Sequence, residues 1–218
     1  MGRASTALVF AGGDPPARAA LRDLPAIDLV IAADSGLAHA RALDVGVDLV
    51  VGDLDSVDRA DLDAAVAAGA VVERHPTAKD ATDLELALLA ARDRGAAEIV
   101  VVGGHGGRLD HFLANVLLLG AAELAGVRVW ARLGDATVTV VRDRAELAGS
   151  PGSLCSLLPV GSPAEGVRTE RLRYPLDRET LFPGSTRGVS NEFLATTAAV
   201  TLERGVLLAV VPHSGKDA

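Results

Sequence analysis

Short apolar runs alternate with amphipathic segments through the first 134 residues of the chain. The runs are two to seven residues long, which is typical of buried strands, and helical periodicity follows several of them. Strands are expected at residues 8–10, 29–33, 49–51, 71–72, 99–102 and 127–133. Helices are expected at 37–43, 58–68, from Thr82 to a stop at Gly95, and 110–125. This alternation predicts an α/β unit with an open, mostly parallel sheet and flanking helices.

The pattern changes after Gly134. Short β-like pieces broken by glycine and proline follow, with no convincing helix between them. They lie at residues 137–141, 154–160, 172–176, 199–202 and 206–211. The sequence therefore predicts two domains, an α/β domain at 1–134 and a small antiparallel, β-sandwich-like domain at 135–218.

Composition narrows the class of protein. Hydrophobic residues make up 49% of the 218 and aromatic residues 3%, so the core should consist of alanine, valine and leucine. A net charge of −8 argues against a nucleic-acid partner held through its phosphates. Cys155 is the single cysteine, which excludes a disulfide framework and fits a reducing compartment. With neither a signal-peptide pattern nor a membrane-length apolar run, a cytoplasmic protein without membrane contact is expected.

Acidic residues follow several of the predicted strands. Asp34 ends one strand, and Gly52-Asp53-Leu54-Asp55-Ser56 follows the next. Lys79-Asp80-Ala81-Thr82-Asp83 and Arg108-Leu109-Asp110-His111 come after two others. In an open parallel sheet the carboxyl ends of the strands form the ligand crevice. Acids delivered to that one edge predict a site for a divalent metal and phosphate.

Each acidic motif also has a simpler interpretation. Asp53 and Asp55, two residues apart, would face the same side of a continuing strand and could share Mg²⁺, or they could simply form turns. Asp83, in a first helical turn, could complement the helix dipole or support a metal-bridged phosphate. Asp80, three residues earlier, makes a purely capping role less convincing. Lys79 could be a solvated surface lysine or a phosphate contact.

The segment from Gly103 to Arg108 contains four glycines between a strand and a helix. It matches neither the P-loop nor the dinucleotide fingerprint. Four glycines nevertheless let backbone N–H groups approach an anion closely, although an ordinary flexible loop is the alternative. Asp110 could cap the following helix or act on substrate. His111, which shares a helix face with Asn115, is expected to orient a neighbour by hydrogen bonding.

These motifs, in this order, resemble the thiamine pyrophosphokinase (thiamine diphosphokinase) family. The motifs are Ala33-Asp34-Ser35-Gly36, the Asp53 and Asp55 segment, Asp80-Ala81-Thr82-Asp83 and the glycine-rich run to His111. The C-terminal stretch from Ser185 to Phe193 is similar to the family's thiamine segment. The resemblance covers almost the whole chain, with Ser35 and Leu54 as mild departures from residues that the family often has.

The resemblance implies an enzyme that transfers the diphosphoryl group of ATP to the hydroxyl of thiamine, giving thiamine diphosphate and AMP. It implies a catalytic domain at 1–134, a thiamine-binding and dimerisation domain at 135–218, and a homodimer with active sites at the subunit interface. By matching positions, the implied Mg²⁺ ligands are Asp53, Asp55 and Asp83.

The resemblance also assigns roles to single residues. Arg108 and Asp110 join the three metal acids as implied catalytic residues. The implied ATP contacts are Lys79, Asp80, Thr82, Gly104, Gly106, Gly107 and Arg108. The implied thiamine contacts are Asp34, Asp110, Ser190 and Asn191. Phe193 and Tyr174 are the candidates for stacking on the thiamine rings.

Two other functions fit parts of this pattern. The same acids could serve diphosphoryl transfer to another alcohol, such as a hydroxymethyl pterin. A non-enzymatic nucleotide-binding module on the same fold would be expected to lose its metal acids. Ser190-Asn191 favours thiamine over the first alternative, and the presence of Asp53, Asp55, Asp80, Asp83 and Asp110 argues against the second.

Overall fold

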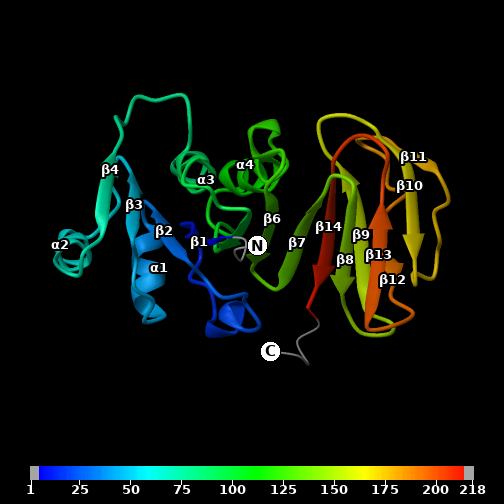
Figure 1. Ribbon diagram of the computed structural model, residues 1–218, viewed down its shortest axis with the longest axis horizontal. Coiled ribbons are helices and arrows are strands. Elements are labelled where there is room, and N and C mark those ends of the chain that lie inside the picture. The colour runs from blue at the N-terminus through cyan, green and yellow to red at the C-terminus, as the bar shows by residue number, and fades with distance from the viewer. Residues whose placement is uncertain (1–4, 214–218) are drawn as a thin grey trace. The chain divides into compact units, whose positions relative to one another are not determined.

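The computed structural model describes residues 5–213 of the chain. The chain divides into two compact units, Met1–Gly134 and Asp135–Ala218 (Figure 1). The division falls where the hydrophobic pattern changes, after Gly134. Each unit has its own core, and each is described by itself.

The first unit is built on a parallel sheet. Its strand order is β6-β5-β1-β2-β3-β4, and every neighbouring pair in it runs parallel. Valine, isoleucine and alanine dominate the central strands, which are buried on both faces as parallel strands require. The predicted open parallel sheet is thereby confirmed. The strands are β1 (Thr6–Phe10), β2 (Leu29–Ala33), β3 (Leu49–Gly52), β4 (Val71–Arg74), β5 (Glu98–Val102) and β6 (Arg128–Leu133).

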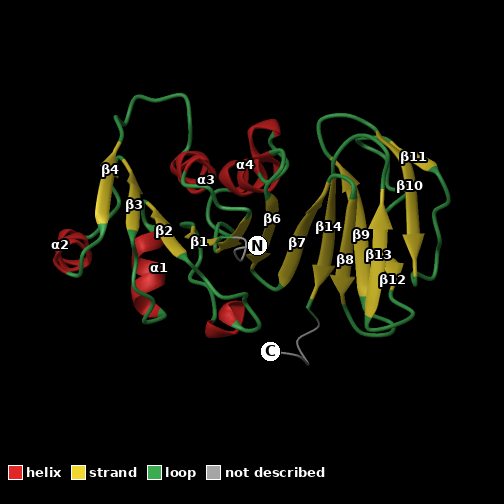
Figure 2. Cartoon of the chain, viewed as in Figure 1, coloured by secondary structure: helices red, strands yellow, loops and turns green. Residues whose placement is uncertain are grey.

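Helices cover both faces of this sheet (Figure 2). One face packs against α1 and α2 through Leu37 and Leu62, and the other carries α3 and α4. Side-chain caps fix two of the helix starts: Asp58 caps α2 and Thr82 caps α3. The helices are α1 (Gly36–Ala42), α2 (Arg59–Ala67), α3 (Asp83–Asp93) and α4 (Leu109–Leu118), with short 3₁₀ turns η1 (Arg18–Leu21) and η2 (Ala122–Leu124).

The helix predicted at 110–125 was wrong in its second half. α4 ends at Leu118, where the N–H groups of Gly120 and Ala121 bond carbonyls three residues back rather than four. This tighter turn leads into η2, whose Leu124 is buried. The apolar periodicity continued past Gly120 because buried leucines follow α4, at Leu119 and at Leu124 in η2, although the chain changes direction between them.

The second unit contains two antiparallel sheets, in the order β7-β14-β9-β12 and β8-β13-β10-β11. One apolar cluster joins residues from both, including Leu157 and Leu207 from the first and Val167 and Val200 from the second. The predicted sandwich-like arrangement is confirmed. The strands are β7 (Ala136–Val141), β8 (Arg144–Ala148), β9 (Leu154–Pro159), β10 (Ala164–Glu170), β11 (Glu179–Leu181), β12 (Asn191–Glu192), β13 (Thr197–Thr201) and β14 (Leu207–Pro212).

The strand predicted at 172–176 was also wrong. Leu172 and Leu176 are buried in the core, but the segment forms only an isolated bridge, between Leu172 and Phe193. Pro175 has no N–H to offer a neighbouring strand, and the N–H of Tyr174 bonds the Asn191 side chain instead. The alternation of Leu172 and Leu176 therefore reflects their burial in the core and not pairing with a neighbouring strand.

Four strands of this unit were not predicted: β8, β10, β11 and the two-residue β12. β8, β10 and β11 contain many charged residues, and their inward positions are few, such as Leu147 and Val167. Strands with one solvated face give only a weak hydrophobic signal. Across residues 5–213, no helix combines the length and the apolar character that crossing a lipid bilayer requires.

Candidate functional site

The strand order of the first unit reverses between β1 and β5. From β1 the chain proceeds outward through β2, β3 and β4, whereas β5 and β6 lie on the other side of β1. Ligands of open α/β sheets bind outside the carboxyl ends of the strands at such a reversal. The loops that follow β1 and β5 therefore mark the expected binding position.

Two glycine loops interlock at this position. The Gly104 N–H donates to the Gly12 carbonyl at 2.6 Å, and the Asp14 N–H donates to the His105 carbonyl at 2.8 Å. A Cβ on Gly13 would lie 2.2 Å from that His105 oxygen, so no larger residue fits. Gly12-Gly13-Asp14 received no functional role from the sequence, although a glycine pair just after a strand is a usable signal.

The loop after β5 is held in a defined conformation. Gly103, Gly104, Gly106 and Gly107 all adopt positive φ, which glycine accepts without steric cost. The Asn115 side-chain amide, on α4, donates to the Gly104 carbonyl at 3.1 Å. The alternative of an ordinary flexible loop is disfavoured, and Asn115 does the orienting that was expected of His111.

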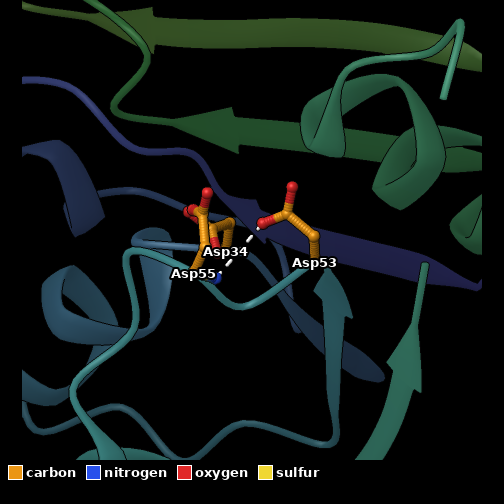
Figure 3. Close-up of side chains that lie close together, drawn as sticks. All are labelled: Asp34, Asp53 and Asp55. Atoms are coloured by element: carbon orange, nitrogen blue, oxygen red, sulfur yellow. Dashed lines mark hydrogen bonds between the residues drawn. The ribbon is translucent and has the colours of Figure 1, made fainter. Parts of the chain in front are cut away.

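Three carboxylates gather close to these loops, since a Cβ on Gly12 would meet the side chain of Ser35, the residue that follows Asp34. One oxygen each from Asp34, Asp53 and Asp55 lies within 4.8 Å of the other two (Figure 3). Asp34 follows β2 with φ 47°, and Leu54 turns the chain after β3 with φ 65°, so that Asp53 and Asp55 flank a buried leucine. Two of the three aspartates predicted as metal ligands, Asp53 and Asp55, lie together with Asp34, and the third, Asp83, lies next to this group.

The hydrogen bonds of this cluster leave room for a cation. Ser56 Oγ donates a short bond to Asp34 Oδ2, whereas the buried Asp34 Oδ1 has no hydrogen-bond partner among residues 5–213. The Asp53 charge, followed by burial, raises the pKa of Asp55 above its usual value. A buried, unpartnered carboxylate oxygen among like charges fits a divalent cation, since Mg²⁺ favours carboxylate ligands.

Asp53 has a different environment from Asp55. Its Oδ1 accepts the Asp55 N–H at 3.2 Å, and this bond lowers the pKa of Asp53, with burial opposing and Lys79 adding to the effect. Asp53 is therefore ionised at neutral pH even without a metal.

Asp83 lies next to the cluster and is paired with Lys79. A Cβ on Gly52 would be 3.0 Å from Asp83 Oδ1 and 3.1 Å from the Asp34 Cβ, which shows how closely the three residues pack. Lys79 Nζ lies 2.9 Å from Asp83 Oδ1 and 3.3 Å from Asp53 Oδ2. Burial lowers the pKa of Lys79, but the hydrogen bonds to Asp83 and Asp53 outweigh it and raise the pKa overall. The alternative of a solvated surface lysine is disfavoured.

The remaining predicted phosphate contacts are exposed. Asp80 and Thr82 lie at the surface before α3, and Thr82 Oγ1 accepts the Glu85 N–H at 3.2 Å as its N-cap. Arg108 donates to Asp110 at 2.6 Å from the start of α4. This hydrogen bond lowers the pKa of Asp110 to about 2. Asp110 is accordingly a weak base.

In the second unit, Asn191 is buried, and both polar atoms of its side chain are hydrogen-bonded. Its Oδ1 accepts the N–H groups of Tyr174 and Glu192, both at 2.9 Å, and its Nδ2 donates to the Tyr174 carbonyl at 2.7 Å. The neighbouring Ser190 is exposed, with φ 58°. Asn191 thus fixes the Tyr174 backbone beside Ser190.

The two candidate stacking residues differ in burial. Phe193 is 1% exposed in the core, whereas Tyr174 is 51% exposed. Only the Tyr174 ring of this pair is available to a ligand. Two other reactive residue types are structural: His39 Nδ1 bonds the Ala11 carbonyl at 2.9 Å, and burial raises the pKa of Cys155 to about 12, which keeps the thiol neutral.

Known proteins share this architecture. Residues 23–131 match the family model of the thiamin pyrophosphokinase catalytic domain, and residues 138–207 match that of the thiamin pyrophosphokinase vitamin B1 binding domain. The thiamine pyrophosphokinase of Bacillus subtilis (strain 168) is 27% identical over 180 residues, which cover 77% of this chain and 80% of that protein.

Solved structures agree with the family models. The crystal structure of thiamine pyrophosphokinase from Bacillus subtilis aligns with a TM-score of 0.83 at 23% identity, over 96% of this chain and 100% of that one. A thiamin pyrophosphokinase family protein from Enterococcus faecalis aligns with a TM-score of 0.78 at 26% identity, over 97% and 100%. With both of its units matched by the family's two domain models, this chain belongs to the thiamine pyrophosphokinase family.

Proposed function

We propose that this chain transfers the diphosphoryl group of ATP to the hydroxyl of thiamine and releases AMP. The observation that carries the proposal is the carboxylate cluster of Asp34, Asp53 and Asp55 beside the interlocked glycine loops. The match of the second unit to a vitamin B1 binding domain supports thiamine over a hydroxymethyl pterin as the acceptor. A non-enzymatic module is disfavoured because the acids of the site are retained.

The cofactor that best fits the cluster is Mg²⁺. Asp53 and Asp55 would hold it together with Asp34, whose buried Oδ1 has no hydrogen-bond partner among residues 5–213 and is free to bind a cation. Asp83 lies close enough to the group to join them. When bound, Mg²⁺ neutralises negative charge on the phosphate oxygens and on the AMP leaving group. Asp34, predicted from the sequence to contact thiamine, is reassigned to the metal in this proposal.

Backbone and side-chain donors of the first unit would hold the ATP phosphates. The positive-φ loop presents the N–H groups of Gly106 and Gly107, whereas the N–H of Gly104 is bonded to the Gly12 carbonyl and supports the loop from within. Arg108 adds a guanidinium for charge-assisted bonds. Lys79, Asp80 and Thr82 remain predicted contacts at the start of α3. The N–H groups of the loop, Arg108 and Lys79 would stabilise the charge of the transferring group without any change of protonation, whereas the carboxylate of Asp80 can only accept hydrogen bonds.

Asp110 suits orientation of the thiamine hydroxyl better than removal of its proton. Its pKa of about 2 makes it a weak base at neutral pH. A loose phosphoryl-transfer transition state requires little early proton removal, so a well-placed acceptor is sufficient.

On the acceptor side, we propose that Ser190 and the Tyr174 ring contact thiamine, and that Asn191 acts by holding Tyr174. Asn191→Ala is expected to weaken thiamine binding about tenfold with little change in ATP binding, because it frees the Tyr174 backbone and leaves buried N–H groups unpaired. Tyr174→Leu should weaken thiamine binding without the loss of stability that Asn191→Ala causes.

Calorimetry with each ligand alone measures both effects, and thermal melting separates them. The oligomeric state of each variant is checked first. A loss of ATP affinity with unchanged thiamine affinity in Asn191→Ala would place the acceptor pocket elsewhere.

The resemblance to the family extends the proposal to a homodimer. Leu109, Leu113 and Leu117 recur every four residues along α4 and are 70%, 51% and 56% exposed, which is an apolar stripe of the kind that subunit interfaces cover. A reducing, cytoplasmic location is also proposed, supported by the single cysteine being a buried, free thiol.

The function is tested by incubating the protein with ATP, Mg²⁺ and one candidate acceptor at a time. AMP release that depends on thiamine supports the proposal. AMP release with a hydroxymethyl pterin and none with thiamine would select the other acceptor. ATP binding without turnover in any mixture would indicate the non-enzymatic module.

A further inference from the structure

The Lys79 ammonium lies between two carboxylates of the candidate metal site. It is 2.9 Å from Asp83 Oδ1 and 3.3 Å from Asp53 Oδ2. The side chains of Lys79, Asp53 and Asp83 are 14%, 11% and 27% exposed, so this is a largely buried ion pair and not a surface contact. The lysine occupies the loop before α3, four residues ahead of Asp83.

Lys79 supplies the counter-charge in a strongly acidic place. Asp34, Asp53, Asp55 and Asp83 lie together, and among residues 5–213 the ion pairs recorded for these four acids all involve Lys79. Arg74 is also near, but its Nη1 donates to the Asp53 backbone carbonyl at 3.2 Å and not to a carboxylate. One ammonium thus contacts the oxygens that a metal would need.

We propose that Lys79 is a built-in counter-cation that competes with the divalent metal for Asp53 and Asp83. In the metal-free protein its ammonium holds the two carboxylates together. Binding of the metal displaces it, because two cations a few ångströms apart in a partly buried site repel each other. The displaced ammonium is then available to a phosphate of the incoming nucleotide.

This exchange would couple the metal to the nucleotide. A metal ion alone must displace Lys79 into solvent, whereas a metal–nucleotide complex offers the ammonium a new anionic partner. The metal therefore binds more weakly by itself than together with a phosphate-bearing ligand, and Lys79 accounts for part of the difference. The inference takes the metal from the proposed function, but the competition itself requires no turnover.

The test is the affinity for Mn²⁺ alone, measured by electron paramagnetic resonance or calorimetry without nucleotide. Lys79→Met keeps most of the apolar stem and removes the charge, and it is expected to tighten Mn²⁺ binding about fivefold or more. Lys79→Arg keeps the charge and should bind Mn²⁺ no more tightly than the wild type. Arg74→Gln removes a nearby charge that touches no carboxylate, and it should tighten binding far less than Lys79→Met.

Thermal melting provides a second readout. Without metal, Lys79→Met should melt below the wild type because the four acids lose their counter-charge. Saturating Mn²⁺ should raise its melting temperature by more than it raises that of the wild type, since tighter binding to the folded state stabilises it more.

Weaker or unchanged Mn²⁺ binding in Lys79→Met would overturn the proposal, because it would make Lys79 a scaffold for the acids and not a competitor. If Arg74→Gln tightened Mn²⁺ binding as much as Lys79→Met, the proposal would also be overturned. The effect would then come from the loss of any positive charge near the site and not from the contacts of Lys79 with the carboxylates. If Lys79→Met does not fold, Lys79→Gln replaces it in the same comparison. A failure of the protein to produce AMP from ATP would refute the proposed function and leave these metal affinities unaffected.

Discussion

Replacing Asp55 with asparagine is expected to remove most turnover while leaving the metal-free protein at least as stable as the wild type. Asp55 is one of three carboxylates whose oxygens lie within 4.8 Å of one another. A metal ion can lower the activation free energy by several kcal/mol through stabilising transition-state charge. Weaker metal binding in Asp55→Asn should therefore lower kcat/KM by about 100-fold or more. Steady-state kinetics at limiting Mg²⁺ measures this loss.

The stability half of this prediction follows from the raised pKa of Asp55. A carboxyl that is harder to ionise when folded destabilises the folded state above its folded pKa, and the penalty disappears below the ordinary value of 3.8. Asp55→Asn removes the penalty, so its gain in metal-free stability should be present at neutral pH and absent below about pH 3.8. Melting in EDTA at several pH values tests the sign.

Asp63→Asn is the matched control for charge. Asp63 lies on α2 with 73% of its side chain exposed, so its loss removes one negative charge away from the site. It should change neither kinetics nor stability appreciably. Near-wild-type turnover in Asp55→Asn at limiting Mg²⁺ would make the cluster a set of turn residues.

Gly13→Ala is expected to disrupt the interlocked glycine loops and with them the affinity for ATP. The added Cβ would lie 2.2 Å from the His105 carbonyl oxygen, and Gly13 has φ +95°. Relieving the collision requires one loop to move, which should cost about 3 kcal/mol or more of unfolding free energy. Calorimetry with ATP and urea unfolding measure the two effects.

Gly69→Ala separates the collision from the backbone penalty. Gly69 follows α2 with φ +107° and has open space where a Cβ would be placed. It should lose only about 1 kcal/mol of unfolding free energy and keep its ATP affinity. If Gly13→Ala and Gly69→Ala lost the same unfolding free energy and the same ATP affinity, the contact between the two glycine loops would contribute to neither.

The sheet of the first unit could be predicted because its strands are buried on both faces. Continuous apolar runs such as Ile99 to Val102 have few other interpretations when glycine or proline bounds them. Asp58 and Thr82 mark the starts of α2 and α3, because each side chain accepts a hydrogen bond from a backbone N–H two or three residues later. Local chemistry of this kind is visible in a sequence.

The polar strands of the second unit were harder to predict. Leu172 and Leu176 alternate like a strand, yet Pro175 and the Asn191 side chain exclude a ladder there. β8 and β10 give little hydrophobic signal because one face of each is solvated. Both pair with β13, which lies far away from them in the sequence. Pairing between strands so far apart in the sequence depends on the whole fold and cannot be predicted from local patterns.

The candidate site was predicted in its residue types but not in its pairing. Asp53 and Asp55 were placed together by their spacing after a strand. The entry of Asp34, the contact of Gly52 with Asp83 and the bridging position of Lys79 depend on how the ends of β2 and β3 and the start of α3 meet. Similarly, Asn191 was predicted as a thiamine contact, whereas its three hydrogen bonds to backbone groups, which no sequence pattern shows, support the positioning role that we propose for it.

The central claim is the transfer of an intact diphosphoryl group, and the fate of labelled phosphates tests it most directly. The wild-type protein is incubated with thiamine, Mg²⁺ and ATP labelled at either the α- or the γ-phosphorus. The proposed function predicts α-label in AMP and γ-label in thiamine diphosphate. Alpha-label in ADP with γ-label in thiamine monophosphate would contradict it, because that distribution requires the transfer of a single phosphoryl group.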